Sequence, residues 1–67
     1  MSVFCLWTDR IHYVASSFEM MLKEVKIYQT DPRVWWFKID DAYIEEWTID
    51  GPQCTIWRFD NDEWRKQ

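Results

Sequence analysis

The chain has 67 residues, of which 48% are hydrophobic and 30% are charged, and its formal net charge is −4. This composition is typical of a folded chain, and the length suffices for one small domain, which excludes multidomain architectures, α/β barrels and enzymes that need a large cleft. Six Trp, three Tyr and four Phe are present, but only one Gly and two Pro. A domain of about this size buries only about 60% of the surface that its unfolded chain exposes, so large aromatic side chains or a partner surface are expected to supply further burial.

The first fifteen residues predict a β-hairpin. Val3 to Thr8 is a run of aliphatic and aromatic residues, and Ile11 to Ala15 resumes the same extended, apolar pattern. Asp9 and Arg10 separate the two runs and are expected to form the connection between the strands.

A helix is predicted to follow this hairpin. Ser16 precedes Glu19 by three residues, the spacing of a capping box in which each side chain satisfies a backbone N–H of the first turn. Apolar residues then recur at helical spacing and form a stripe on one face. The members of this stripe are Phe18, Met21, Leu22, Val25 and Tyr28.

The end of this helix is predicted at Asp31, because Pro32 pushes the preceding residue out of the helical region. We expect the helix to extend to about Gln29. Val25 to Thr30 is also compatible with a strand, followed by a turn with Pro at its second position, and that alternative stays open.

Three strands are predicted in the second half of the chain. Val34 to Asp40 has the strongest strand pattern, with Trp36 on its less buried side. Tyr43 to Ile49 and Gln53 to Phe59 also alternate with a period of two, and Asp50-Gly51-Pro52 is the turn between them. The predicted core combines the helical stripe with aromatic residues of these strands. These are Trp35, Phe37, Trp47, Trp57 and Phe59.

The predicted order is therefore strand, strand, helix, strand, strand, strand. It corresponds to a single α+β domain over residues 1–67, with an antiparallel sheet of four to five strands and one helix packed on a face. Residues 60–67 are expected to form a polar C-terminal tail that carries one aromatic residue, Trp64.

Negative charge is concentrated late in the chain. Eight acidic residues lie between Asp40 and Glu63, against Arg58 as the one basic residue. This region would repel nucleic acid, whose affinity for proteins comes mainly from Lys and Arg on phosphates. Two interpretations stay open, a solvated face that keeps the protein dispersed and an acidic surface that meets a basic protein. The candidate partner-binding residues are Trp36, Asp40, Asp41, Glu45, Glu46 and Trp64.

Residues that could carry chemistry are few. Cys5 and Cys54 have no C-x-x-C spacing and are expected to be free thiols. His12 could serve as a base for Cys5, Ser16 or Ser17, but it lacks an orienting third group at a recognisable spacing. The acidic run at residues 60–63 lacks the Gly and the late Glu of a calcium loop. We therefore expect no catalytic residue, no metal site and no cofactor.

The N-terminal segment does not predict export. Met1 to Trp7 is apolar but has no basic residues before it and is too short for a signal peptide or a membrane span. The protein is expected to act in the cytoplasm.

Two segments resemble short open reading frames of bacteriophages. They are Tyr-Val-Ala-Ser-Ser-Phe-Glu (Tyr13 to Glu19) before the helix and Ile-Glu-Glu-Trp-Thr-Ile-Asp-Gly (Ile44 to Gly51) at the end of a strand. This resemblance is one of class, covers about half of the chain and assigns no functional residue. It implies a stoichiometric inhibitor of host or bacterial defence proteins in the host cytoplasm, a class in which some members mimic DNA through acidic residues.

The sequence thus predicts a small acidic binding protein without enzymatic activity. Its expected partner is a host or bacterial protein with a basic surface, with neither nucleic acid nor membrane as a direct ligand; a homodimer is a further candidate. The alternative function is a small-ligand or nucleotide binder in which Trp36 or another exposed Trp stacks on the ligand.

Overall fold

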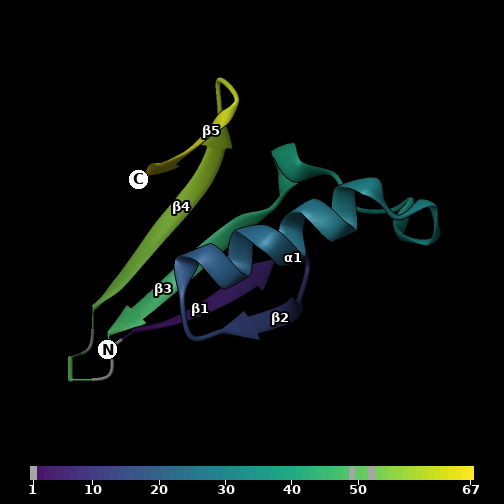
Figure 1. Cartoon of the computed structure of the whole chain (residues 1–67). Helices are drawn as coiled ribbons and strands as arrows, with labels where there is room; N and C mark the ends of the chain where they lie inside the picture. The colour runs from purple at the N-terminus through teal and green to yellow at the C-terminus, as the bar shows by residue number, and fades with distance from the viewer. Residues whose placement is uncertain (1, 49, 52) are drawn as a thin grey trace.

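Five antiparallel strands and one helix make up the protein (Figure 1). The computed structural model describes residues 2–48, 50–51 and 53–67. The strands are β1 (Ser2–Trp7), β2 (Ile11–Ala15), β3 (Tyr43–Thr48), β4 (Cys54–Asp60) and β5 (Glu63–Lys66), and the helix is α1 (Phe18–Thr30). The sheet has the order β2-β1-β3-β4-β5, and α1 lies across one of its faces. The predicted α+β class is confirmed.

Helix α1 begins one residue later than the capping box predicts. Ser17 has extended backbone angles (φ −143°, ψ 154°), and its hydroxyl accepts a hydrogen bond of 3.1 Å from the Met20 N–H, so Ser17 is the N-cap. Glu19 is then the second helical residue and is placed too early to return a bond to the cap. Its carboxylate lies 3.9 Å from Lys23 one turn later.

The C-terminal end of α1 settles the alternative for Val25 to Thr30 in favour of helix. The Asp31 N–H still donates to the Ile27 carbonyl at 2.9 Å, and Pro32 follows at once. Helix α1 spans 13 residues, and within the described part of the chain no helix combines the length and hydrophobicity needed to cross a bilayer.

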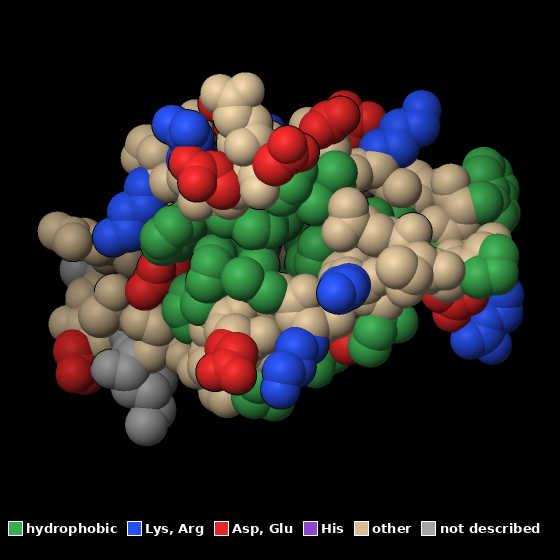
Figure 2. All heavy atoms as spheres, turned by 45° about the horizontal axis from the view of Figure 1, so that its top comes forward, with side chains coloured by type: hydrophobic (Ala, Val, Ile, Leu, Met, Phe, Trp, Pro, Cys, Tyr) green, Lys and Arg blue, Asp and Glu red, His purple; other side chains and the backbone are tan. Residues whose placement is uncertain are grey.

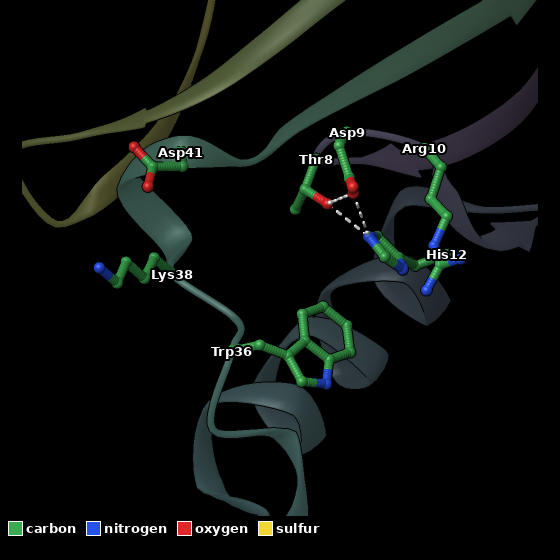
Figure 3. Close-up of a pocket in the computed structure, with 7 residues that line it drawn as sticks. All are labelled: Thr8, Asp9, Arg10, His12, Trp36, Lys38 and Asp41. Atoms are coloured by element: carbon green, nitrogen blue, oxygen red, sulfur yellow. Dashed lines mark hydrogen bonds and ion pairs between the residues drawn. The ribbon is translucent and has the colours of Figure 1, made fainter.

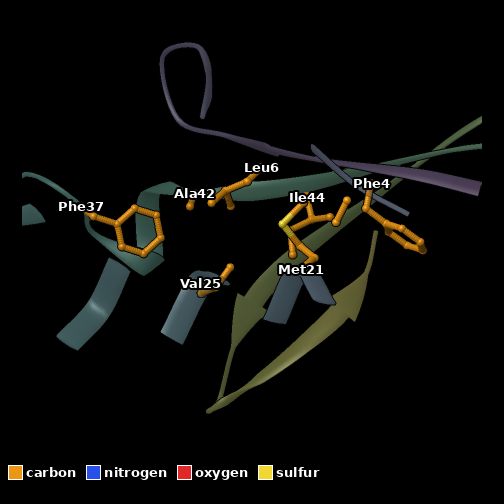
Figure 4. Packing of buried hydrophobic residues seen from close by; sticks show 8 residues of the cluster. Phe4, Leu6, Met21, Val25, Phe37, Ala42 and Ile44 are labelled. Carbon is orange, nitrogen blue, oxygen red and sulfur yellow. The ribbon is translucent and has the colours of Figure 1, made fainter. Parts of the chain in front are cut away.

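The core lies between α1 and the centre of the sheet (Figure 4). Met21 and Val25 of the helix are buried, as are Leu6 of β1 and Ile44 of β3, which are direct cross-strand partners. The rest of the helical stripe packs against the edge of this cluster, as predicted. The core cluster comprises Phe4, Leu6, Ala15, Met21, Val25, Phe37, Ala42 and Ile44.

The strand predicted for Val34 to Asp40 is wrong. Two 3₁₀ turns, η1 (Pro32–Val34) and η2 (Ile39–Asp41), occupy this segment. The Asp31 side chain caps η1 by accepting from the Arg33 N–H at 2.9 Å, and the Arg33 guanidinium also binds that carboxylate. Local hydrogen bonds thus replace a sheet ladder. Trp35 is 82% exposed and does not belong to the core as predicted.

The faces of β3 are also opposite to the prediction. Ile44 and Glu46 point toward the helix, while Trp47 lies exposed on the other face. The predicted alternation is present, but a period of two does not say which of the two faces is buried. The large apolar side chain of Trp47 favoured the wrong face. Of the turn predicted at residues 50–52, the Gly51 N–H donates to the Thr48 carbonyl at 3.3 Å, and residues 49 and 52 lie outside the described part.

The predicted polar tail is wrong as well, because residues 63–66 form β5. Asn61 and Asp62 both have positive φ (50° and 63°), the backbone of a tight two-residue hairpin turn that Asn and Asp tolerate better than other side chains. Trp64 then pairs with Phe59 across the hairpin. The fifth strand comes from the C-terminus and not from the segment before η2.

Met21→Ala is expected to lower the free energy of unfolding by about 2–5 kcal/mol, since it leaves a cavity in the centre of the core. Met20 is the matched control, because it lies on the same helix but is 48% exposed. Met20→Ala should cost less than about 1 kcal/mol. Urea unfolding of the two variants measures the difference, and equal costs would contradict the described face of α1.

Candidate functional site

The predicted partner-binding acids do not form one surface. Glu45 and Glu46 are neighbours on β3 and therefore point to opposite faces of the sheet. Glu46 accepts hydrogen bonds from the Trp57 indole N–H at 3.1 Å and from the Ser2 hydroxyl at 3.2 Å. Glu45 lies on the other face, 3.4 Å from the indole N–H of Trp47. Glu46 is thus committed to an internal contact.

The other predicted residues lie in three places. Asp40 and Asp41 are on η2, which contacts β4. Trp36 is 42% exposed beside the β1–β2 connection, whereas Trp64 is half-buried on β5. The two Trp residues predicted to act together are therefore on different parts of the molecule.

An aromatic patch lies between α1 and the β4–β5 hairpin. The rings of Phe18 and Trp57 have centroids 4.7 Å apart, and those of Phe59 and Trp64 are 5.5 Å apart in an edge-to-face arrangement. All four side chains are half-buried. Figure 2 shows apolar side chains gathered on this face. We call these four residues the aromatic patch.

Charged side chains of both signs surround the apolar side chains of this face (Figure 2). Asp60, Asp62 and Glu63 cluster at the β4–β5 turn, next to the Phe59–Trp64 pair. Glu46 is bound to the Trp57 indole. The Lys66 ammonium lies 5.3 Å from the Trp57 ring centroid. The Arg65 guanidinium pairs with the Glu63 carboxylate at 2.8 Å. The border of the patch therefore carries both charges, with Asp60 and Asp62 as an acidic group at the turn.

The opposite, outer face of the sheet is also apolar. Trp7 and Tyr43 are cross-strand partners whose rings stack 6.1 Å apart, and the Arg58 guanidinium lies 5.0 Å over the Tyr43 ring. Val14 is 54% exposed at the edge of this face. The strand register places one set of apolar residues here. They are Val3, Cys5, Trp7, Ile11, Val14, Tyr43, Trp47, Cys54 and Ile56.

Both cysteines are free thiols on this outer face, as predicted. Burial raises the pKa of the Cys5 thiol, and the charge of Glu45 adds to the effect. Burial also raises the pKa of the Cys54 thiol, again with a contribution from Glu45. A raised thiol pKa lowers the thiolate fraction at neutral pH, so neither cysteine has the environment of an activated nucleophile.

A pocket of about 600 Å³ opens where the β1–β2 connection faces the segment between η1 and η2 (Figure 3). It is absent from the predictions except for Trp36 and Asp41. A β-bulge in the β1–β2 pairing places His12 at this pocket. The lining residues are Thr8, Asp9, Arg10, His12, Trp36, Lys38 and Asp41.

Thr8, Asp9 and His12 form a hydrogen-bonded group in this pocket. The Thr8 hydroxyl donates to the Asp9 carboxylate at 2.9 Å and also contacts Nε2 of His12. A hydroxyl has one proton, so Nε2 of His12 must donate to the Thr8 oxygen. In this arrangement His12 cannot remove a proton from Thr8. The group orders Asp9 and His12 rather than activating a nucleophile.

The same hydrogen bond changes the acidity of Asp9. The bond from the Thr8 hydroxyl is the main cause that holds the pKa of the Asp9 carboxyl below its ordinary value of 3.8. The stabilisation it brings is therefore complete above pH 3.8 and is lost as the pH falls through the lower folded-state pKa. At neutral pH the Asp9 carboxylate is charged and oriented toward Thr8.

The sequence contained no local signal for the aromatic patch or for the pocket. Phe18 and Trp57 are far apart in the chain, as are His12 and Trp36, and each pair meets only after the sheet has formed. Within the described ranges, no three His, Cys, Asp or Glu side chains group as a metal site. Comparison with protein-family models, curated proteins and solved structures finds no match for this chain.

Thr8→Val should raise the pKa of Asp9 toward 3.8, because the variant keeps the shape of the side chain but loses the hydroxyl donor. NMR titration of the Asp carboxyl carbons measures this change. Asp31 is an internal control in the same sample, since its lowered pKa depends on Arg33 and should not move. An unchanged Asp9 titration would contradict the assigned hydrogen bond.

Proposed function

We propose that the protein is a small, non-enzymatic binding protein that docks on a partner through the aromatic patch of Phe18, Trp57, Phe59 and Trp64. The observation that supports this most directly is the pair of contacts between half-buried aromatic rings, which lie next to the acidic residues of the β4–β5 turn. Binding energy at protein interfaces is concentrated in a few aromatic and Arg side chains near the centre of the contact. The patch has the composition of such a centre.

The acidic β4–β5 turn specifies the chemistry of the partner. Asp60 and Asp62 lie at this turn beside the patch, Glu63 is paired with Arg65 at 2.8 Å, and the chain as a whole carries a net charge of −4. Opposite charges steer two proteins together and discriminate against wrong partners, while buried apolar contacts hold the complex. The partner surface should therefore be basic with an apolar centre. Nucleic acid would be repelled by the same acidic turn.

The resemblance to small bacteriophage proteins favours a host or bacterial defence protein as this partner, in the host cytoplasm. A protein that covers a basic surface stoichiometrically would block the binding of the normal ligands of that surface, including nucleic acid. This role needs neither a cofactor nor a catalytic residue.

Trp64→Ala should weaken capture of a partner from bacterial lysate at least about tenfold, mainly through faster dissociation, because it removes an anchor of the patch. Trp35→Ala is the matched control, since Trp35 is 82% exposed and lies away from the patch. Trp64→Phe should retain most of the binding by preserving the ring contact with Phe59. Equal capture by Trp64→Ala and Trp35→Ala would contradict the proposal.

The charge component is tested with two double variants. Asp60→Asn with Asp62→Asn removes the border charge while keeping a side chain that tolerates the positive φ of residue 62. Glu19→Gln with Glu24→Gln removes the same charge from α1. The first pair should slow association and flatten its salt dependence, and the second should not. If both behave alike, the border serves only to keep the protein dispersed.

The outer face favours self-association as a second use of the sheet. Exposed apolar patches larger than a few hundred Å² are rare on monomers and commonly mark interfaces. We propose a homodimer in which two outer faces meet. Val14→Lys should then convert the dimer to a monomer, whereas Ile27→Lys should not, because Ile27 is equally exposed (52% against 54%) but lies on α1. Light scattering measures the mass, and a monomeric unmodified protein would contradict this.

A further inference from the structure

Helix α1 covers only part of the inner face of the sheet. Strands in a sheet lie about 4.8 Å apart, so five strands extend over about 19 Å, whereas a helix with its side chains is about 10 Å wide. Helix α1 packs mainly on β1 and β2, at one side of the sheet. The β4–β5 hairpin forms the other side and diverges from α1 (Figure 1). The uncovered part of this face is therefore about as wide as one further helix.

The aromatic patch occupies this uncovered part. Strand alternation places Trp57, Phe59 and Trp64 on the side of the sheet that α1 also covers, and Phe18 at the start of α1 contacts the Trp57 ring. All four side chains stay only half-buried. The apolar face of a sheet is stabilised when another element packs on it. The hairpin therefore presents an apolar layer next to α1 that this chain leaves without a second helix.

The edge of the hairpin disfavours a strand as the occupant. Strand β5 is the last strand of the sheet, and three of its residues are charged, namely Glu63, Arg65 and Lys66. Charged side chains on an edge strand discourage the addition of another strand by backbone pairing. A partner that packs on the inner face, over the rings, does not need this edge.

The two ends of the hairpin differ in charge. Asp60 and Asp62 supply negative charge at the turn, whereas the Lys66 ammonium lies over the Trp57 ring at the other end. A helix carries a partial positive charge at its N-terminus and a partial negative charge at its C-terminus. A helix on the patch is therefore favoured with its N-terminus toward the turn.

The length of the patch matches two turns of a helix. The β4–β5 pairing runs from Trp57 and Lys66 to Asp60 and Glu63, a distance of about 10 Å at about 3.3 Å per residue. Helical positions i and i+7 are about 10.5 Å apart, because a helix rises about 1.5 Å per residue. Three apolar side chains at i, i+3 or i+4, and i+7 would thus reach the whole patch.

We infer that the partner places an amphipathic helix on the aromatic patch, beside α1, with the N-terminal end of that helix at the Asn61–Asp62 turn. Its apolar stripe packs on Trp57, Phe59 and Trp64, and a Lys or Arg near its N-terminal end faces the acidic turn. Docking of an apolar helix face on a complementary surface is a recurring mode of peptide recognition. The inference rests on the proposed docking function and specifies the element of the partner that makes the contact.

NMR titration of the full chain with designed peptides tests the inference. The probe is an Ala-rich peptide of about 18 residues, long enough to form a helix in water, with Leu at i, i+3 and i+7 and Lys near its N-terminus. The matched control has the same composition but Leu at alternating positions, which form no stripe on a helix. The probe should shift the indole N–H signals of Trp57 and Trp64 and bind at least about tenfold more tightly than the control.

Spin labels on the probe test its orientation on the unmodified protein, so the result does not depend on the folding of a variant. A nitroxide at the N-terminal end of the peptide should broaden the backbone signals of Asn61 and Asp62. A nitroxide at the C-terminal end should broaden the signal of Gln67 instead, because Gln67 follows β5 at the opposite end of the hairpin.

Variants separate the apolar from the charged part of the contact. Trp64→Ala should weaken binding of the probe about tenfold, whereas Trp35→Ala should leave it unchanged, since Trp35 lies away from the patch. A second peptide carries Glu in place of the N-terminal Lys and should bind less tightly at low salt. Asp60→Asn with Asp62→Asn should reduce this difference, and comparison of the two proteins cancels any difference in helicity between the peptides.

The inference is overturned if the alternating peptide binds as tightly as the probe, if the probe does not shift the two indole signals at millimolar concentration, or if the spin labels report the reverse orientation. Shifts of these signals with protein concentration alone, without peptide, would assign the patch to a second copy and also overturn it. If Trp64-dependent capture from lysate persists beside any of these results, only the helix is refuted. Binding of the probe without Trp64-dependent capture would instead contradict the docking function.

Discussion

The contact between α1 and the centre of the sheet is the interaction on which the rest of the structure depends. Met21 and Val25 meet Leu6 and Ile44, and these side chains are almost completely removed from water. A domain of this size has one such core, and its stability is the small difference between that burial and the entropy of ordering the chain. Partly buried residues of the other elements pack around this contact.

One helix cannot cover five strands, and the exposed aromatic surface follows from that limit. Helix α1 packs on β1 and β2 and leaves the inner side of the β4–β5 hairpin partly open. Trp57, Phe59 and Trp64 complete the hairpin by packing on one another and on Phe18. The same side chains that stabilise the hairpin therefore remain available to a partner. Fold and proposed function share these residues.

The short connections create the second candidate site. Capping by Asp31 and the fixed φ of Pro32 turn the chain into η1 directly after α1, which brings Trp36 against His12. Had this segment paired as a strand, Trp36 would lie on a sheet face and the hollow beside Thr8 would not exist. Local hydrogen bonds near a helix end thus determine whether the protein has a pocket.

The sequence by itself determined the elements whose patterns are long and local. Periodic apolar residues located α1, apolar runs located β1 and β2, and alternation located β3 and β4, because each of these patterns lies within one short segment of the sequence. It did not distinguish Ser16 from Ser17 as the cap, since both precede the same apolar stripe and only the backbone angles differ.

Tertiary structure decided the rest, for physical reasons that no local pattern contains. The segment Val34 to Asp40 has a strand pattern but does not form a strand, because the capped turn at Asp31 directs the chain into η1. Residues 63–66 form β5 and not a polar tail, because Asn61 and Asp62 adopt a tight turn that lets Trp64 reach Phe59. Which face of β3 is buried depends on where α1 lies, so Ile44 is in the core and Trp47 is outside. Both candidate sites join residues that are far apart in the sequence, and such contacts exist only in the folded protein.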